Sequence, residues 1–310
     1  MTATTSYDPS LDRPAWIRII PFLLFHVAAL IAALLVRPTL TDLLVCAFFY
    51  FSRMFGIAGV YHRYFSHRTY STSRVFQFAL AFWACTSAQK GPLWWAAHHR
   101  HHHRYSDQPE DVHSPTQRGF WWSHVGWILA PRFDKTDLDA IRDFSKYPEL
   151  RFLNRFHLLP PVLFAATLLA LGGLHLFVWG FLVSTVVLWH GTFTINSLAH
   201  VFGRRRFETT DTSRNSLLLA LLTTGEGWHN NHHYYPGSMT QGFYWWQIDV
   251  TGYLVRLLSW LGLVWDIRTA PPRVLALGRG RAEPKSELPP QLAAEEAGVS
   301  EALNRAGARG

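Results

Sequence analysis

Apolar residues along the chain fall into four long runs, which polar residues divide into two pairs. Because a helix needs about 20 mainly apolar residues to cross a bilayer, each run predicts a membrane-spanning helix. Only a few residues separate the runs within each pair, so the pattern predicts two helical hairpins. We expect an all-α integral membrane protein with four transmembrane helices. The four runs are residues 19–36, 43–61, 158–174 and 176–199.

Lysine and arginine concentrate in the two long polar segments that follow the hairpins. Thirteen lie between His62 and His157, and twelve lie after Ala199. The positive-inside rule therefore places both chain termini and both polar segments in the cytoplasm. We expect residues 62–157 and 200–268 to form one helical cap on the membrane helices. Two shorter apolar runs, Val75–Ala88 and Ser216–Thr223, predict amphipathic or interfacial helices of this cap.

The composition favours a membrane protein and excludes several soluble classes. Charged residues make up only 16% of the chain, whereas soluble proteins usually contain about 25%. The net charge of +8 suits loops beside anionic lipid, and no motif indicates a nucleic-acid partner. The two cysteines, Cys46 and Cys85, are too few for an iron–sulfur cluster. Residues 1–268 therefore form the predicted membrane domain, and the Pro-, Ala- and charge-rich residues 269–310 predict a flexible tail.

One cation, Arg53, falls inside the second apolar run. We interpret it as a side chain that snorkels or contacts the cap. Support of a substrate or a metal site is the alternative.

Histidines form four groups, and every group lies on the predicted cytoplasmic side. Residues three and four apart share a helix face, so each group can present several imidazoles together. In the second group, spacing permits either a face of His99, His102 and His103 or a face of His98, His101 and His102. The likeness to the last group favours the first choice. The groups are His62–His67, His98–His103, Asn196–His200 and His229–His233.

The first group is irregular, because His62 and His67 are five residues apart. A regular α-helix would point them in different directions. Either the helix ends there or the two imidazoles serve different metals.

Nine imidazoles at these spacings are too many for one metal and suit two metals of higher coordination. Ordinary hydrogen-bonded cap histidines and a zinc or nickel site are the alternatives. Apolar surroundings and the lack of cysteine ligands favour iron that performs oxygen chemistry.

The patterns HxxxxH, HxxHH, NxxxH and HxxHH, in this order among four spans, resemble the membrane fatty acyl desaturases of the stearoyl-CoA desaturase type. The resemblance covers Pro38 to Arg268 and includes the stretches RGFWWSHVGW, from Arg118, and GEGWHNNHH, from Gly225. The run HRHHHRYSD also looks like bacterial acyl-lipid enzymes, so we expect a bacterial plasma membrane location. The resemblance implies a centre of two iron ions that uses O₂ to insert a cis double bond, at the Δ9 position, into a saturated acyl chain.

The resemblance also implies the ligands of that centre. Asn196 would hold a metal-bound water. Asp107, Glu110, Asp111 and Glu226 are candidate hydrogen-bond partners of the ligating imidazoles. We expect His98, His101, His113 and His124 to be structural or to support the ligands. The nine implied ligands are His62, His67, His99, His102, His103, His200, His229, His232 and His233.

Because methylenes have no polar groups to bind, selecting one bond of an acyl chain needs a narrow apolar tunnel with a bend. The resemblance then places four residues along it. Thr192 and Phe193 would lie beside it, and Cys46 and Tyr50 would lie near the methyl end of the chain. Arg118 and Arg132 are candidates for head-group binding. Animal relatives carry cations where this chain has Ala97 and Pro131, so acyl-CoA, acyl-lipid and acyl-carrier-protein substrates all stay open.

The implied reaction needs an external electron donor, such as a ferredoxin or cytochrome b5 with its reductase. An acidic donor would suit the positive cap. Two other functions remain possible from the sequence. One is a membrane hydroxylase with the same iron–oxygen chemistry, and the other is a metal-binding transporter or sensor that catalyses nothing.

Overall fold

The computed structural model describes residues 12–280. The chain divides into two compact units, Met1–Ala270 and Pro271–Gly310. Within the second unit, α13 (Pro272–Leu277) is helical, although these residues belong to the predicted flexible tail. The rest of that predicted tail, residues 281–310, lies outside the described residues.

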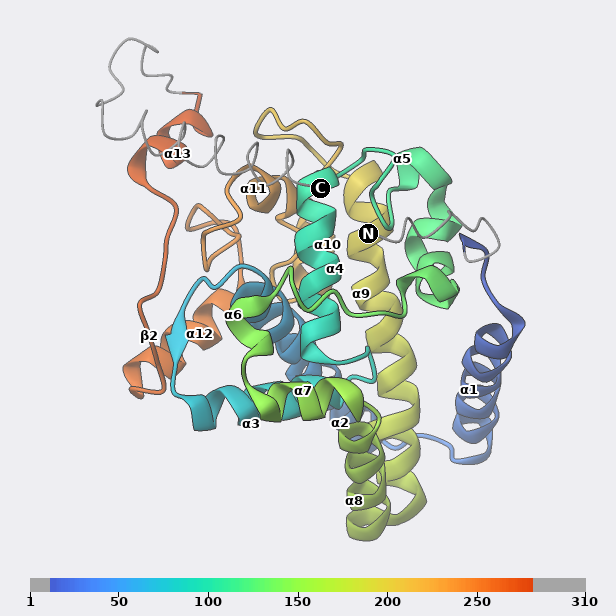
Figure 1. Ribbon diagram of the computed structural model, residues 1–310. Helices are drawn as coiled ribbons and strands as arrows, with labels where there is room; N and C mark the ends of the chain where they lie inside the picture. The colour runs from blue at the N-terminus through green and yellow to red at the C-terminus, as the bar shows by residue number, and fades with distance from the viewer. Residues whose placement is uncertain (1–11, 281–310) are drawn as a thin grey trace. The chain divides into compact units, whose positions relative to one another are not determined.

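The first unit contains long apolar helices of the kind that the hydrophobic runs predict (Figure 1). Within residues 12–280, three segments are long and apolar enough to cross a membrane: Trp16–Leu35, Leu40–Ser66 and Leu159–Val201. They comprise α1 (Trp16–Leu35), α2 (Leu40–Phe55) with the π-helix η2 (Gly56–Ser66), and α8 (Leu159–His175) with the π-helix η6 (Leu176–Val183) and α9 (Ser184–Val201). Thr39 and Asp42 form a capping box that fixes the start of α2.

The third long segment is not one straight helix. Its backbone leaves the helical region at Gly172 and Gly173, and the φ of +59° at Gly173 is one that glycine adopts without steric cost. Beyond this break the chain folds back on itself. Gly180 packs so closely against Leu168 that a Cβ atom added to the glycine would lie 3.0 Å from Leu168 Cδ1. In Figure 1 the arm formed by η6 and α9 runs back beside α8, and the two arms are joined at one end. The break lies at the two glycines between the third and fourth apolar runs, where the sequence pattern places the turn of the second hairpin.

Short helices pack together around the ends of these long helices. The predicted interfacial runs are helical, as α3 (Arg74–Cys85) and α10 (Leu217–Leu222). Two strands, β1 (Ser71–Thr72) and β2 (Val264–Trp265), pair antiparallel. The other elements are α4 (Pro92–Tyr105), α5 (Pro115–Arg118), η3 (Trp122–Gly126), η4 (Trp127–Leu129), η5 (Pro131–Phe133), α6 (Arg142–Ser145), α7 (Pro148–Arg155), α11 (His229–Tyr234) and α12 (Val250–Trp260).

Arg53 joins α2 to α9 instead of snorkelling to a surface. Its side chain is fully buried and donates hydrogen bonds to Thr185 Oγ1 at 2.7 Å and to Ser184 Oγ at 2.5 Å. It also donates to the carbonyl of Thr86, beyond the end of α3. These bonds satisfy a buried cation, so Arg53 fixes how the hairpins meet.

Candidate metal centre and adjoining cavity

Four segments that are distant in the sequence bring the predicted ligands together. The helix η2 carries His62 and is followed by His67 as its C-cap. Three of the predicted ligands lie on α4, one lies on α9, and three lie on α11. In η2 the amide of His67 donates to the carbonyl of His62 at 3.2 Å. This i→i+5 bond is the π-helical pattern, and it places residues five apart on one face. The helix ends here, with His67 as its C-cap, as one of the two predicted alternatives has it, and His62 and His67 lie in one cluster. The spacing of five residues follows from a π-helix, which the sequence pattern does not indicate.

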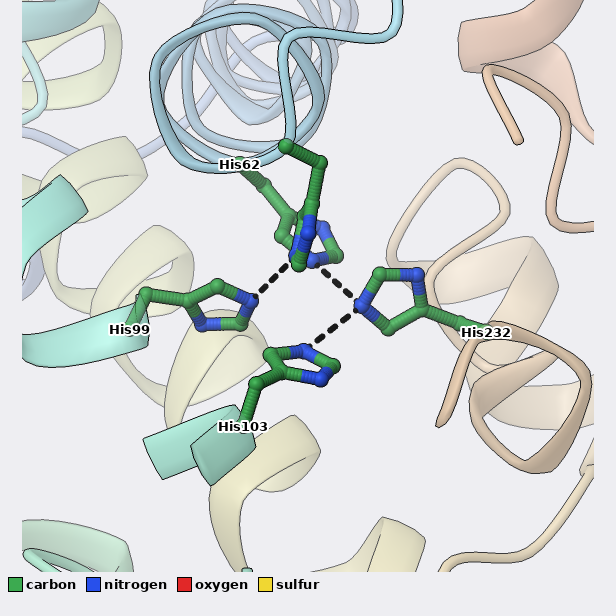
Figure 2. Close-up of side chains that lie close together, drawn as sticks. His62, His99, His103 and His232 are labelled. Carbon is green, nitrogen blue, oxygen red and sulfur yellow. Dashed lines mark hydrogen bonds between the residues drawn. The ribbon is translucent and has the colours of Figure 1, made fainter. Parts of the chain in front are cut away.

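The first cluster, which we name group A, contains five imidazoles whose nitrogen atoms lie within 4.8 Å of one another. Figure 2 shows the rings of His62, His99, His103 and His232 pointing toward a common centre. The Nε2 atom of His232 lies 2.9 Å from that of His62 and 2.9 Å from that of His103. Group A consists of His62, His67, His99, His103 and His232.

The second cluster, group B, contains four imidazoles within the same 4.8 Å limit: His102, His200, His229 and His233. The Nε2 atoms of His200 and His229 are 3.2 Å apart. The Nε2 atoms of His102 and His233 are buried and make no hydrogen bond among the described residues. Together, groups A and B contain all nine histidines that the resemblance implies as ligands.

The structure decides between the two helix faces that spacing left open. His98 turns away and its Nδ1 donates to the carbonyl of Trp94 at 2.9 Å, while the His101 ring bonds the carbonyl of Glu110. Neither belongs to either group. The face of α4 that contributes is therefore that of His99, His102 and His103.

Carboxylates orient one imidazole of group A and three of group B. In group A the Nδ1 atom of His62 donates to Glu226. In group B, Nδ1 donates to a carboxylate oxygen at 2.8 Å in the pair His102–Asp111, at 3.2 Å in His200–Asp107 and at 2.6 Å in His233–Asp211. Asp107, Asp111 and Glu226 were expected partners, whereas Glu110 contacts His101 only through its backbone. Asp211 was missed, because nothing in its spacing marks it.

The positions of the imidazole protons indicate that these groups fit metal ions. A neutral imidazole has one N–H, and where Nδ1 donates it to a carboxylate, Nε2 presents a lone pair. Several lone pairs that converge in a buried space repel one another unless a cation lies between them. The orphaned Nε2 atoms of His102 and His233 are such lone pairs. The donor set therefore fits metal ions bound through Nε2, with carboxylates behind the ligands.

The pKa values of His99 and His103 agree with neutral imidazoles, and those of Asp107 and Asp111 agree with ionised carboxylates. At His102, burial opposes the charged form, but the Asp111 carboxylate outweighs it and raises the pKa of the imidazole. Burial, and then the neighbouring imidazoles, hold the pKa of His99 and His103 well below the ordinary value. Burial opposes ionisation of Asp107 and Asp111, but hydrogen bonds and charge from His200 and His102 outweigh it and lower both carboxyl pKa values. Metal binding needs this state of protonation.

A buried ionic network supports the His62–Glu226 pair. Arg63 donates to Glu226 Oε1 at 2.8 Å and to Asp249 Oδ2 at 2.9 Å. Gln241 Nε2 also donates to Glu226, at 3.0 Å. All of these side chains are buried. The sequence pattern does not indicate Arg63, Gln241 or Asp249, because the network joins Arg63 and His62 to residues more than 160 positions away.

A largely apolar cavity of about 640 Å³ adjoins group A. It extends from His99 and His113 past Trp95 and Trp127 to side chains of α1, α8 and η6 such as Phe25, Ala165 and Phe181. Its size lies within the usual range for small-molecule sites, about 300–1,000 Å³. His99 therefore belongs to group A and to the cavity wall at once.

The residues predicted to contact substrate lie in different places. Thr192, Phe193 and Asn196 line the cavity. Tyr50 lies outside its lining and donates to the carbonyl of Leu222 at 2.7 Å. Cys46 also lies outside, against the hydrophobic cluster of Leu168.

The two arginines predicted to bind the head group also lie outside the cavity lining. Arg118 stacks on Trp122, 3.3 Å from its ring centroid, and Arg132 pairs with Asp12.

Metal ions held by these buried imidazoles would lie beside the largely apolar cavity and could oxidise an apolar ligand held there. A comparison with protein families identifies one model, fatty acid desaturase, that matches residues 33–258. The chain belongs to the fatty acid desaturase family. It is therefore an oxidoreductase that acts on acyl chains.

Curated desaturases are similar over most of the chain. An sn-2 palmitoyl-lipid 9-desaturase of Nostoc sp. (strain 36) is 36% identical over 262 residues, which cover 83% of this chain and 92% of that protein. An sn-1 stearoyl-lipid 9-desaturase of Anabaena variabilis is 34% identical, covering 87% of this chain and 98% of that protein. An acyl-CoA C20 Δ5-desaturase of Anemone leveillei is 37% identical, covering 69% and 70%. This desaturase therefore resembles enzymes named for two different acyl carriers.

Proposed function

We propose that this desaturase uses O₂ to insert a cis Δ9 double bond into the acyl chain of a membrane lipid. The observation that carries the proposal is His99, which lies both in group A and in the wall of the apolar cavity. An oxidising centre must lie beside the carbon atoms that it attacks, and here one imidazole joins the two spaces. The reaction converts CH₂–CH₂, O₂, two electrons and two protons into CH=CH and two water molecules.

Groups A and B would each hold one iron ion, and Asn196 would hold a water beside them. The pair of ions supplies the activation of O₂ when bound. The carboxylates behind His62, His102, His200 and His233 keep each Nε2 aimed inward. The cavity holds the acyl chain in an extended path and excludes water from its reacting carbons. Because methylenes have no polar handle, the shape of the wall selects the bond that reacts.

A lipid-bound acyl chain is the proposed substrate, with acyl-CoA as the second candidate. Two of the relatives are named as acyl-lipid 9-desaturases. The positions of Ala97 and Pro131 lack the cations that the acyl-CoA enzymes of animals use. An acyl-CoA 5-desaturase among the relatives keeps the second candidate open to test.

The membrane arrangement is part of the proposal. The apolar helices cross the bilayer four times, as two hairpins, and both chain termini and the histidine groups face the cytoplasm of a bacterial cell. The break at Gly172 and Gly173 supports the fourth crossing, because it divides an apolar segment of 43 residues. An external ferredoxin or cytochrome b5, with its reductase, supplies the electrons.

The test is fatty-acid profiling by gas chromatography–mass spectrometry in a host without aerobic desaturases. We expect the wild type to form a monounsaturated acid, and derivatisation should locate its double bond at carbon 9. The product should be found in membrane lipids before it is found in other acyl pools. His232→Ala should abolish it, since His232 Nε2 lies between those of His62 and His103. His101→Ala is the matched control and should keep the product. A hydroxy acid would instead identify a hydroxylase, and no product with added reductase and donor would refute the proposal.

A further inference from the structure

The loop between α9 and α10, residues 203–216, carries an exposed positive surface that the metal centre does not use. We name it the arginine loop. Arg204, Arg205 and Arg206 follow one another and are exposed, and Arg214 is half-buried. Of the two carboxylates in the loop, Asp211 is buried against His233, and Glu208 is exposed. The outer face of the loop is therefore positive.

Hydrogen bonds attach this surface directly to the helix that carries three of the histidines. The side chain of Asn230, on α11, accepts from the amides of Arg206 and Phe207, both at 2.7 Å. Its Nδ2 donates to the carbonyl of Phe207 at 3.1 Å. Asn230 is fully buried and follows His229 of group B in sequence. One side chain therefore separates the exposed arginines from group B.

A second connection runs through the same loop. Asp211 accepts from Thr209 Oγ1 at 3.0 Å and from His233 Nδ1 at 2.6 Å. Thr209, in turn, accepts from Arg205 Nη2 at 3.1 Å. The arginine loop is therefore linked to two of the four imidazoles of group B by short chains of covalent and hydrogen bonds.

We propose that the arginine loop is the docking surface for an acidic protein that carries one electron at a time. This inference rests on the proposed function, which consumes two electrons for each double bond. Two reduced carriers are oxidised in turn, and their electrons, with two protons, reduce O₂ to two waters as the acyl chain loses two hydrogens. Charge complementarity selects an acidic partner and increases its rate of association.

An anionic lipid head group is the competing occupant, because Arg204 lies three residues beyond the end of α9. A lipid would need only the positive charge. Binding of a lipid head group does not need the two connections to group B, whereas an electron donor needs short, continuous bonding to its acceptor. The observations therefore favour a redox protein.

The test measures binding and reduction separately, in nanodiscs of zwitterionic lipid, with an acidic [2Fe–2S] ferredoxin as the probe. We expect the double variant Arg204→Glu/Arg205→Glu to raise the Kd for ferredoxin about tenfold at low salt. The wild-type Kd should rise with ionic strength. Desaturation should slow with limiting ferredoxin but not with reduced methyl viologen, a small donor that needs no docking surface. Arg204→Lys/Arg205→Lys should restore ferredoxin binding.

Arg142→Glu is the matched control, since Arg142 is an exposed arginine of α6, outside the loop. The proposal is overturned if the double variant binds ferredoxin as the control does. It is also overturned if the double variant keeps its affinity for ferredoxin and loses only the binding of phosphatidylglycerol, which would identify a lipid as the occupant. Loss of the viologen-driven rate together with metal would show that the arginines only support the fold. Binding does not need turnover, so failure of the proposed function would appear separately, as a wild type that forms no double bond with either donor.

Discussion

The histidine groups and the apolar cavity meet at His99, but different forces hold them together. In the groups, directional hydrogen bonds orient individual rings, as in the 2.8 Å bond from His102 to Asp111. The cavity wall is packed from aromatic and aliphatic side chains, such as the edge-to-face pair of Phe25 and Phe181. A directional network fails abruptly when one member is lost, whereas apolar packing adjusts by degrees. Substitutions in the groups should therefore abolish function, and substitutions in the wall should change selectivity.

The two groups also differ from each other. Group A has five imidazoles, and among its described contacts one is paired with a carboxylate. Group B has four imidazoles, and three of them are paired with carboxylates. A carboxylate on Nδ1 increases the basicity of Nε2. We infer that group B compensates for its smaller number of ligands with better-oriented and more basic ones.

The largest effect is expected at His99, where the two regions meet. His99→Ala should abolish the unsaturated product and lower the metal content of the purified protein, because it removes one ligand of group A. His98→Ala is the control, since His98 lines the same cavity but belongs to neither group. It should keep its metal. Metal analysis by inductively coupled plasma mass spectrometry checks both, and equal metal loss in the two variants would contradict the assignment.

The histidine groups could be predicted well from sequence, because α4 and α11 are regular helices. Spacings of three and four residues project side chains from one face, so local geometry alone brings together His99, His102 and His103. The π-helix that aligns His62 with His67 could not be predicted in this way. Nothing in the spacing of residues 56–66 distinguishes a π-helix from an α-helix, and packing against α3 and α4 accompanies the difference.

The supporting residues and the cavity were predicted less well, because their contacts are distant in sequence. Asp211 and Arg63 contact partners on other segments of the folded chain, and no periodic spacing in the sequence indicates these contacts. Cys46 and Tyr50 were placed near the end of the acyl chain by resemblance, and both lie outside the lining of the cavity. Apolar walls are formed by whichever side chains pack there, so sequence patterns specify them poorly.

The second effect tests whether the carboxylates act only on the metal ligands. Glu226→Gln should weaken metal binding about 10–100-fold. It should also lower the free energy of unfolding by about 3–5 kcal/mol, because it breaks a buried ion pair with Arg63. Asp211→Asn is the control, because Asp211 contacts a histidine in the same way and has no arginine partner among the ion pairs of the described residues. Metal titration and chemical denaturation of the metal-free proteins separate the two effects. Equal loss of stability in both variants would show that Arg63 does not depend on Glu226.

The third effect is graded and belongs to the cavity wall. Ala165→Trp should shorten the acyl chains that are accepted while metal content stays unchanged, because a large ring would occupy space inside the cavity. The product profile in a host that supplies saturated chains of several lengths measures this shift. Ala165→Val, a smaller addition at the same position, should produce a smaller shift. A uniform loss of all products, with the metal retained, would mean that the wall does not measure length.

The smallest effect is expected at Cys46. This residue lies outside the cavity lining, whereas the family resemblance implies a position beside the methyl end of the substrate. If Cys46 bordered the methyl end of the substrate, Cys46→Trp would shorten the product profile as strongly as Ala165→Trp. The structure instead places Cys46 against the cluster of Leu168 and Val178, outside the cavity lining. We therefore expect Cys46→Trp to cost about 1–3 kcal/mol of stability through overpacking, with the ratio of product lengths nearly unchanged. Gas chromatography of the same lipid extracts distinguishes the two expectations. A strong shift toward short products would mean that the substrate extends to Cys46 on α2.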